Sequence, residues 1–117
     1  MKDKYIKYIN HIVNDIQAPY FKNMEDQYGL RPDEYVLVLC KVFNQPVTIK
    51  GKSIFDHNDN EIYYEDSDGN WYKQEYDHNG NVTFQENSNG FWFKREYDQN
   101  NNKIYYEDSN GYIVDNR

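Results

Sequence analysis

The sequence contains a single cysteine, only three prolines and no long run of apolar residues. The cysteine, Cys40, cannot form a disulfide within the chain, and its apolar surroundings (VLVLCKVF) predict a buried structural side chain. No segment approaches the ~20 apolar residues of a membrane-spanning helix. The first residues, MKDKYIKYIN, also lack the apolar core of a signal peptide. We therefore expect a cytoplasmic protein that does not contact a membrane.

Aliphatic side chains are scarce, whereas aromatic ones are plentiful. Leu, Ile, Val and Phe together supply 25 of the 117 residues, which is close to the composition of chains that cannot build a packed core. The 13 tyrosines and two tryptophans offset this shortage, because each large ring buries much area. A small core rich in aromatic side chains is therefore predicted.

Basic residues are outnumbered by acidic ones, 13 to 20, and the excess is confined to one part of the chain. Residues 1–46 are neutral overall, whereas residues 47–117 carry the entire net charge of -7. The acidity argues against direct nucleic-acid binding, because phosphate contacts require Lys and Arg. It favours docking on a basic surface instead. The step in composition divides the chain at this point into two structural parts.

The first part, residues 1–46, predicts a cap of two or three helices. Apolar residues recur at helical spacing at Tyr5, Ile9, Ile12 and Ile16. Residues 20–28 form a second predicted helix, which Gly29 would end. A third is predicted over residues 32–44, where Pro32 precedes two carboxylates that favour a first helical turn. A strand stays open as the alternative for this segment, because apolar residues alternate at Val36, Val38, Cys40 and Val42.

The second part, residues 47–117, is an internal repeat with a period of 21 residues. Aligned residues include Glu65, Glu86 and Glu107; Ser67, Ser88 and Ser109; Trp71 and Trp92; and Lys73 and Lys94. Each copy contains two turn signals between short aromatic runs, which is typical of consecutive β-hairpins. We predict an α+β fold, in which the helical cap is followed by an antiparallel meander of six or seven strands. Because repeats bury their apolar faces mainly on their neighbours, we expect a chain cut after Asn81 not to fold.

The odd period constrains the sheet, because side chains alternate between its two faces. Equivalent residues share a face only if one turn per copy shifts the alternation, as a bulged Gly loop alternating with a two-residue Asn-Gly turn would do. In that register Glu65 lies opposite Lys73, and Lys73 lies opposite Glu86. Both tryptophans then share a face with Tyr63, Glu75 and Phe84. We assign the core to the other, more apolar face, which carries Ile62, Tyr64, Tyr72, Tyr76, Phe93, Tyr97, Ile104 and Tyr106.

Two of the repeat units are YEDSDGNWYKQEYDHNGN and QENSNGFWFKREYDQNNN. They resemble the tyrosine-rich hairpin repeats of bacterial and bacteriophage proteins, in the style of YD-type and MORN-type repeats. The resemblance covers residues 53–117. It implies a single-layer antiparallel sheet and a structural or binding module, with no catalytic residue carried over. It also implies a phage or mobile-element context.

No cluster in the sequence points to catalysis or to a metal site. Three Asp-x-Asn-x-Asn segments begin at Asp56, Asp77 and Asp98, but none has the Gly and Glu that a calcium loop needs later on. Asx turns explain them, since Asp and Asn side chains bond the backbone two residues on. The recurring glutamates follow the repeat, as a structural Glu–Lys ladder would. We therefore expect no enzyme, no metal and no cofactor.

These patterns predict a non-catalytic protein-binding factor. The expected partner is a host or defence-system protein whose basic, nucleic-acid-handling surface the acidic sheet would cover, the role of a phage inhibitor such as an anti-CRISPR. The expected contact residues are aromatic anchors and repeated carboxylates, namely Trp71, Trp92, Tyr63, Phe84, Glu65, Glu75, Glu86, Glu96 and Glu107. Two alternatives stay open: a self-assembly module that forms a homodimer through a sheet edge, and a carbohydrate-binding module.

Overall fold

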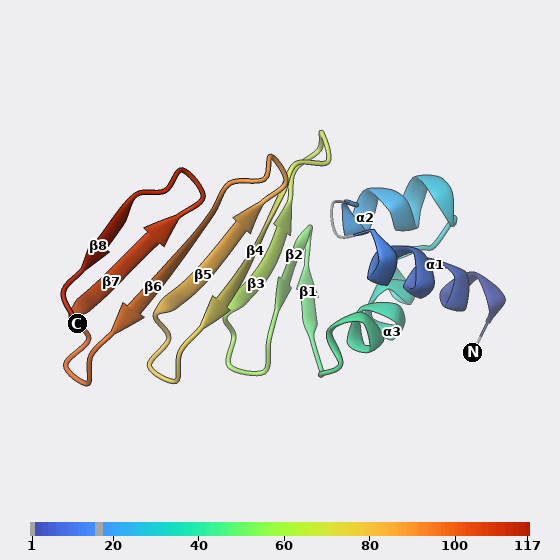
Figure 1. The fold of residues 1–117 in the computed structure, drawn as a ribbon. Coiled ribbons are helices and arrows are strands. Elements are labelled where there is room, and N and C mark those ends of the chain that lie inside the picture. Colours follow the sequence, from blue (N-terminus) through green and yellow to red (C-terminus); the bar gives the residue numbers. More distant parts are fainter. Residues whose placement is uncertain (1, 16–17) are drawn as a thin grey trace.

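The computed structural model describes residues 2–15 and 18–117, and it has the predicted α+β layout (Figure 1). Helix α1 spans Asp3–Asn14, and helix α2, Tyr20–Lys22, continues as the π-helix η1, Asn23–Gln27. Helix α3 spans Pro32–Phe43, so the strand alternative for this segment is wrong. The predicted stripe residue Ile16 lies outside the described residues.

The local sequence explains where α3 begins and ends. Pro32 takes the first helical position, and the Glu34 carboxylate accepts the backbone N–H of Arg31 at 3.0 Å, which satisfies one of the donors that a helix start leaves open. At the other end Asn44 adopts a left-handed conformation, with φ 55°, and terminates the helix.

A single eight-stranded antiparallel sheet follows, with its strands in sequence order. The strands are β1 (Thr48–Lys50), β2 (Ser53–Phe55), β3 (Glu61–Glu65), β4 (Trp71–Tyr76), β5 (Val82–Asn87), β6 (Trp92–Tyr97), β7 (Lys103–Asp108) and β8 (Ile113–Asp115). The meander is thus longer than the six or seven strands predicted. The difference lies in the short β1–β2 hairpin, whose turn at residues 51–52 lacks the Asp and Asn turn signal of the later copies.

The predicted shift in face alternation occurs once per copy, but it lies within the strands and not in a turn. The pairing slips between Glu75 and Tyr76 and again, 21 residues later, between Glu96 and Tyr97. The turns on both sides of the sheet are alike, because in each the first residue's N–H bonds the carbonyl four residues on. The predicted alternation of two turn types is therefore wrong, and a β-bulge in the strand makes the shift.

The observed register confirms one predicted cross-strand pair and corrects another. Lys73 lies opposite Glu86, as predicted, and Glu75 lies opposite Phe84 on the face that they were predicted to share. Glu65, however, lies opposite Trp71, whereas Lys73 lies opposite Tyr63. The turn explains this difference, because Glu65 and Trp71 immediately flank the five residues from Asp66 to Asn70 and pair across them.

The core lies at one end of the sheet, and it uses the face that we assigned to the surface. The helices pack at the β1 end, while β5–β8 project away from them (Figure 1). Ile54, Tyr63 and Trp71 are buried there with Tyr20 and Phe21 of α2. The predicted core face is therefore wrong: apart from Ile62, its residues are half-buried or exposed, namely Tyr64, Tyr72, Tyr76, Phe93, Tyr97, Ile104 and Tyr106.

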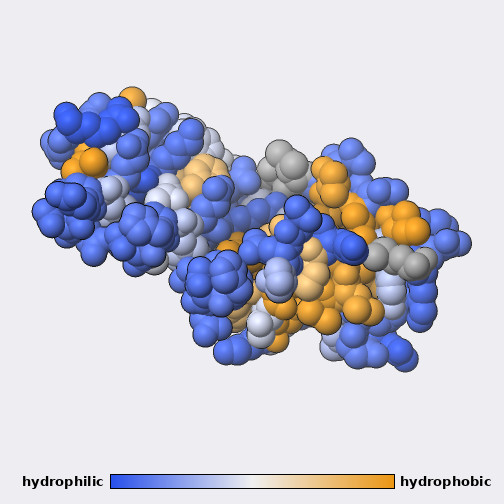
Figure 2. Space-filling view, turned by 90° about the horizontal axis from the view of Figure 1, so that it is seen from below, coloured by the Kyte–Doolittle hydropathy of each residue, from blue (hydrophilic) through white to orange (hydrophobic). Residues whose placement is uncertain are grey.

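The long, uneven shape follows from this arrangement. The principal extents are 49 × 28 × 22 Å. Figure 2 shows hydrophobic residues gathered over the helical half and a mostly hydrophilic surface over the half that β5–β8 form. All buried apolar side chains among the described residues lie between Tyr5 and Trp71. The last four strands therefore extend as a single layer beyond the core.

Candidate functional site

One face of the sheet, here called the helix-bearing face, carries all nine predicted contact residues. The strand registers place on it Ile54, Tyr63, Glu65, Trp71, Lys73, Glu75, Phe84, Glu86, Trp92, Lys94, Glu96, Tyr105, Glu107, Ile113 and Asp115. Because one bulge per copy offsets the odd period, equivalent residues of successive copies stay on the same face. The helices cover the beginning of this row and leave its continuation open.

Three of the nine predicted contact residues are buried beneath α2, so they cannot meet a partner directly. The ring of Tyr63 stacks on Tyr20 at 4.4 Å between centroids and lies 6.2 Å from Trp71. The Glu65 carboxylate accepts the backbone N–H groups of Phe21 at 2.9 Å and Lys22 at 2.8 Å, and the Tyr63 hydroxyl at 2.6 Å. Tyr63, Glu65 and Trp71 thus hold the helical cap on the sheet.

Lys73 marks the border between the covered and the open part of the face. Its Nζ lies 4.8 Å from the ring centroid of Tyr20 and 4.6 Å from that of Trp71, which is cation–π geometry. Burial lowers the pKa of Lys73, and the Glu86 carboxylate on the next strand acts in the opposite direction. Burial also raises the pKa of Tyr20 to about 12. The border is therefore tightly packed and electrostatically coupled to the open part.

The continuation of the row over β5–β8 is here called the open face. It consists of half-buried or exposed side chains, namely Phe84, Glu86, Trp92, Lys94, Glu96, Tyr105, Glu107, Ile113 and Asp115. The rings of Phe84 and Trp92 stack at 6.4 Å, and the Lys94 Nζ lies 5.4 Å from the Trp92 ring. The Tyr105 hydroxyl donates to Glu107 at 2.8 Å. The sheet thus presents aromatic rings framed by carboxylates.

Five of the predicted contact residues lie on the open face, and a sixth lies at its border. The five are Phe84, Trp92, Glu86, Glu96 and Glu107, and Glu75 is exposed on the neighbouring strand β4. The predicted contact residues did not include Tyr105 and Lys94, which also lie on the open face. The repeat itself held the signal for both, because Tyr105 is equivalent to Tyr63 and Lys94 to Lys73.

Charge is divided between the two faces of β5–β8. The open face carries four carboxylates, Glu86, Glu96, Glu107 and Asp115, against the ammonium of Lys94. Arg117 at the end of the chain pairs with Glu96 at 3.0 Å and Asp115 at 3.0 Å. The reverse face instead carries Arg95, whose guanidinium lies 4.3 Å from the centroid of the Phe93 ring. The acidic excess therefore faces the same side as the open aromatic rings.

The repeated serines have a structural role that the repeat alone does not reveal. Ser88 donates its backbone N–H to the carbonyl of Trp71 at 2.8 Å, and its hydroxyl accepts the Trp71 N–H at 3.1 Å. Ser109 makes the same pair of contacts with Trp92, at 2.9 Å and 3.2 Å. Each serine thus links the first residue of one strand to the turn that follows the next strand.

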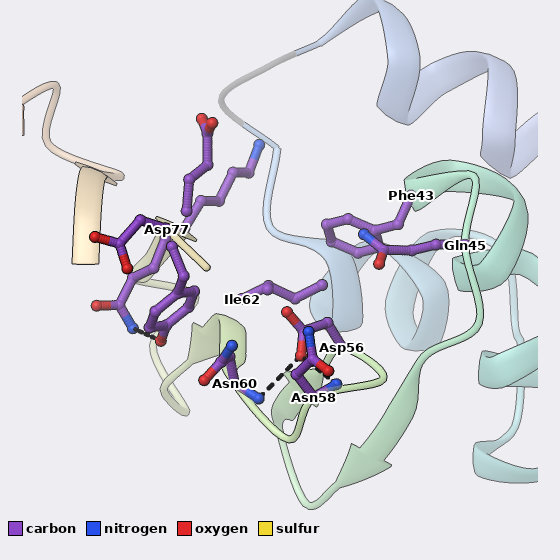
Figure 3. A pocket seen from close by; sticks show the side chains of 11 residues that line it. Phe43, Gln45, Asp56, Asn58, Asn60, Ile62 and Asp77 are labelled. Carbon is purple, nitrogen blue, oxygen red and sulfur yellow. Dashed lines mark hydrogen bonds between the residues drawn. The ribbon is translucent and has the colours of Figure 1, made fainter. Parts of the chain in front are cut away.

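A hollow of about 430 Å³ lies between the end of α3 and the first repeat turns (Figure 3). Phe43 and Ile62 supply its apolar wall, and Asp56 lies beside them on the turn. The Asp56 carboxylate accepts the backbone N–H groups of Asn58 at 2.9 Å and Asn60 at 3.0 Å, which confirms the predicted Asx turn. The Asp56 carboxylate therefore serves the turn itself.

Metal-binding side chains do not cluster in the described part of the chain. Within residues 2–15 and 18–117, no three His, Cys, Asp or Glu side chains gather closely enough to hold a metal ion. His11 bonds the Tyr28 hydroxyl at 2.8 Å, and His57 and His78 are exposed at turn tips. No described helix has both the length and the apolar character that crossing a bilayer would require.

Comparison with known proteins gives no further assignment. No protein-family model matches the chain, and a search of curated proteins finds no significant match.

Proposed function

We propose that this protein is a non-catalytic binding factor that contacts another protein through the open face. One observation carries the proposal: the face that binds the chain's own helical cap continues, uncovered, over four further strands. A single sheet layer beyond the core adds little burial to the fold. Aromatic side chains such as Trp92 and Tyr105 are also the residue types enriched at interface hot spots.

The charge of the open face defines the class of partner. Its carboxylates outnumber its basic groups, so it complements a surface rich in Lys and Arg. Proteins that handle nucleic acids have such surfaces. The proposed role is therefore that of an inhibitor which covers a nucleic-acid-handling surface of a host or defence-system protein, in line with the resemblance to phage hairpin repeats.

The decisive experiment compares two aromatic substitutions that lie on opposite faces of the same strand. Immobilised protein captures partners from bacterial lysate, and the captured protein is then purified for binding kinetics. Trp92→Ala should weaken its binding by ~2 kcal/mol or more, whereas Phe93→Ala, on the reverse face, should leave binding unchanged. An equal loss of binding free energy in both variants would refute the proposal that the open face is the contact surface.

The salt dependence of association tests the electrostatic part separately. Glu86→Gln combined with Glu107→Gln should slow association at low salt and matter little at high salt, because surface charges act mainly through steering. An association rate that ignores ionic strength would contradict an acidic contact surface.

Self-association is the second candidate, and the exposed edge of the sheet favours it. Strand β8 lies at this edge, where Tyr112 and Ile113 are 60% and 57% exposed. An exposed edge with apolar side chains can pair with another copy, although a three-residue strand offers few hydrogen bonds. Analytical ultracentrifugation distinguishes the candidates, since a dimer that Ile113→Lys disrupts would support assembly. Trp71 is buried and therefore cannot stack on a carbohydrate, which weakens the carbohydrate-binding alternative.

A further inference from the structure

The first copy of the repeat binds the N-terminal end of the chain's own helix α2. The backbone N–H groups of Phe21 and Lys22, in the first turn of α2, bond the Glu65 carboxylate. The N–H of Tyr20 bonds the Tyr63 hydroxyl at 2.9 Å. These N–H groups belong to a helix start, where donors have no partner within the helix, and the helix dipole favours a carboxylate there.

An aromatic side chain completes this contact. Tyr20 is the first residue of α2, and its ring stacks on Tyr63 with an interplanar angle of 16°. The Lys73 ammonium also contacts this ring, 4.8 Å from the Tyr20 centroid. The first copy therefore recognises two features together: open backbone donors and an aromatic ring at the start of a helix.

The second and third copies repeat the parts of this site on the open face. Phe84 and Trp92 stack at 6.4 Å and 25°, as Tyr63 and Trp71 do at 6.2 Å and 27°. The hydroxyl-to-carboxylate bond of Tyr63 and Glu65 recurs between Tyr105 and Glu107, at 2.8 Å.

Between these two copies lies a hollow of about 370 Å³. Its lining includes Phe84, Lys94 and Tyr105. The open face thus carries the groups that hold α2, divided between two copies. The stacked rings and Lys94 belong to the second copy, and the hydroxyl–carboxylate pair belongs to the third.

We propose that the open face binds the first turn of a helix that begins with an aromatic residue, in a partner protein. This inference rests on the proposed function and names the element that the face recognises. Glu86 or Glu107 accepts the open backbone donors, and the rings of Phe84, Trp92 and Tyr105 pack against the partner's aromatic side chain. The chain's own Tyr20 and Phe21 cannot fill this role, because they are buried in the first copy.

The probe is an acetylated peptide of residues 18–29, which carries the α2 start, added to the intact protein. The chain has two tryptophans, so two indole N–H signals in a ¹⁵N spectrum report the open face and the covered face separately. We expect the Trp92 signal to shift on titration while the Trp71 signal stays. A peptide with Tyr20→Ala should not bind, because it lacks the aromatic ring.

Variants of the protein identify the recognising groups. Glu86→Gln with Glu107→Gln should weaken peptide binding about tenfold, the factor of one charge-assisted hydrogen bond, and Phe93→Ala should leave it unchanged. Binding that survives the double glutamine variant would overturn the proposal, as would a shift confined to Trp71, which indicates exchange with α2 in the first copy.

The outcome also separates this inference from the proposed function. A captured partner whose binding requires Trp92, together with a peptide that does not bind, would overturn the helix-start proposal and leave the contact surface standing. If neither the partner nor the peptide depends on Trp92, both proposals fail.

Discussion

Glu65 provides the most direct test of how the helical cap is held. Its carboxylate is 3% exposed and accepts three hydrogen bonds, from Phe21 N–H, Lys22 N–H and the Tyr63 hydroxyl. Substitution by alanine leaves three donors without this acceptor, of which the Phe21 N–H and the Tyr63 hydroxyl are buried and the Lys22 N–H is part-buried. Each buried donor without an acceptor costs ~1–3 kcal/mol. Because relaxation and water entry recover part of this, we expect Glu65→Ala to lower the free energy of unfolding by ~3–6 kcal/mol. That is a large part of the ~5–15 kcal/mol typical of a domain.

The repeat supplies a matched control at the equivalent position. Glu86 occupies the same place in the next copy, but it is half-buried and lies beyond α2. Glu86→Ala should therefore cost ~1 kcal/mol or less, the range of one cross-strand pair. Glu65→Gln should fall between these values. Its amide oxygen can still accept the Phe21 N–H and the Tyr63 hydroxyl, while its NH₂ group then opposes the Lys22 N–H.

Urea unfolding, followed by far-ultraviolet circular dichroism, measures all three variants. Hydrogen exchange at the Phe21 and Lys22 amides gives a local readout, because both amides should lose protection in Glu65→Ala and keep it in Glu86→Ala. Equal destabilisation by the two alanine variants would refute the conclusion that Glu65 anchors the helix start.

Three further predictions follow from burial and charge. Trp71→Ala should destabilise the fold by ~3–5 kcal/mol and Trp92→Ala by ~1 kcal/mol or less, measured by urea unfolding, because only Trp71 lies in the core. The Tyr5 hydroxyl, the Arg31 N–H and Lys4 hold the pKa of Glu34 at about 2, below its usual 4.5, so the stability it contributes above pH 4.5 should be lost as the pH falls towards 2. Melting temperatures of the wild type and Glu34→Gln should accordingly differ at neutral pH and converge near pH 2. Calcium at low millimolar concentration should leave the melting temperature unchanged, because the turn carboxylates already bond the backbone.

The repeat predicted the meander because its turn chemistry is local. Asp and Asn side chains bond the backbone two residues on, so the turn sequence alone positions each hairpin. The odd period likewise required one shift of face alternation per copy, and the bulges supply it. Helix α3 was predictable for the same reason, since Pro32 and Glu34 specify its first turn.

The choice of core face was not predictable from the repeat. Both faces carry aromatic rings, and Glu65, Glu86 and Glu107 are equivalent in sequence. Only the helical cap distinguishes Glu65 from its two equivalents, because the cap covers the first copy and buries Glu65 under the start of α2. The sequence cannot distinguish this buried carboxylate from an exposed one, because its two backbone donors come from a segment more than 40 residues away.

The position of the core also reverses our expectation for a shortened chain. Every buried apolar side chain in the described part of the chain lies between Tyr5 and Trp71, so a chain cut after Asn81 keeps them all. It loses the two contacts of Ser88 with Trp71 and the pairing along one edge of β4.

Each lost hydrogen bond contributes a net ~0.5–1.5 kcal/mol, and the backbone groups at the exposed edge of β4 can bond water instead. We therefore expect the free energy of unfolding of residues 1–81 to fall by a few kcal/mol, and the shortened chain to stay folded. Residues 1–81 should therefore unfold cooperatively in urea, with Trp71 fluorescence and circular dichroism giving the same midpoint. Different midpoints for the two signals would show that β5–β8 stabilise the core through their neighbours, as in a repeat whose units cannot fold alone. A cooperative transition would instead show that the last four strands are dispensable for folding, which is what the binding role proposed for their open face requires.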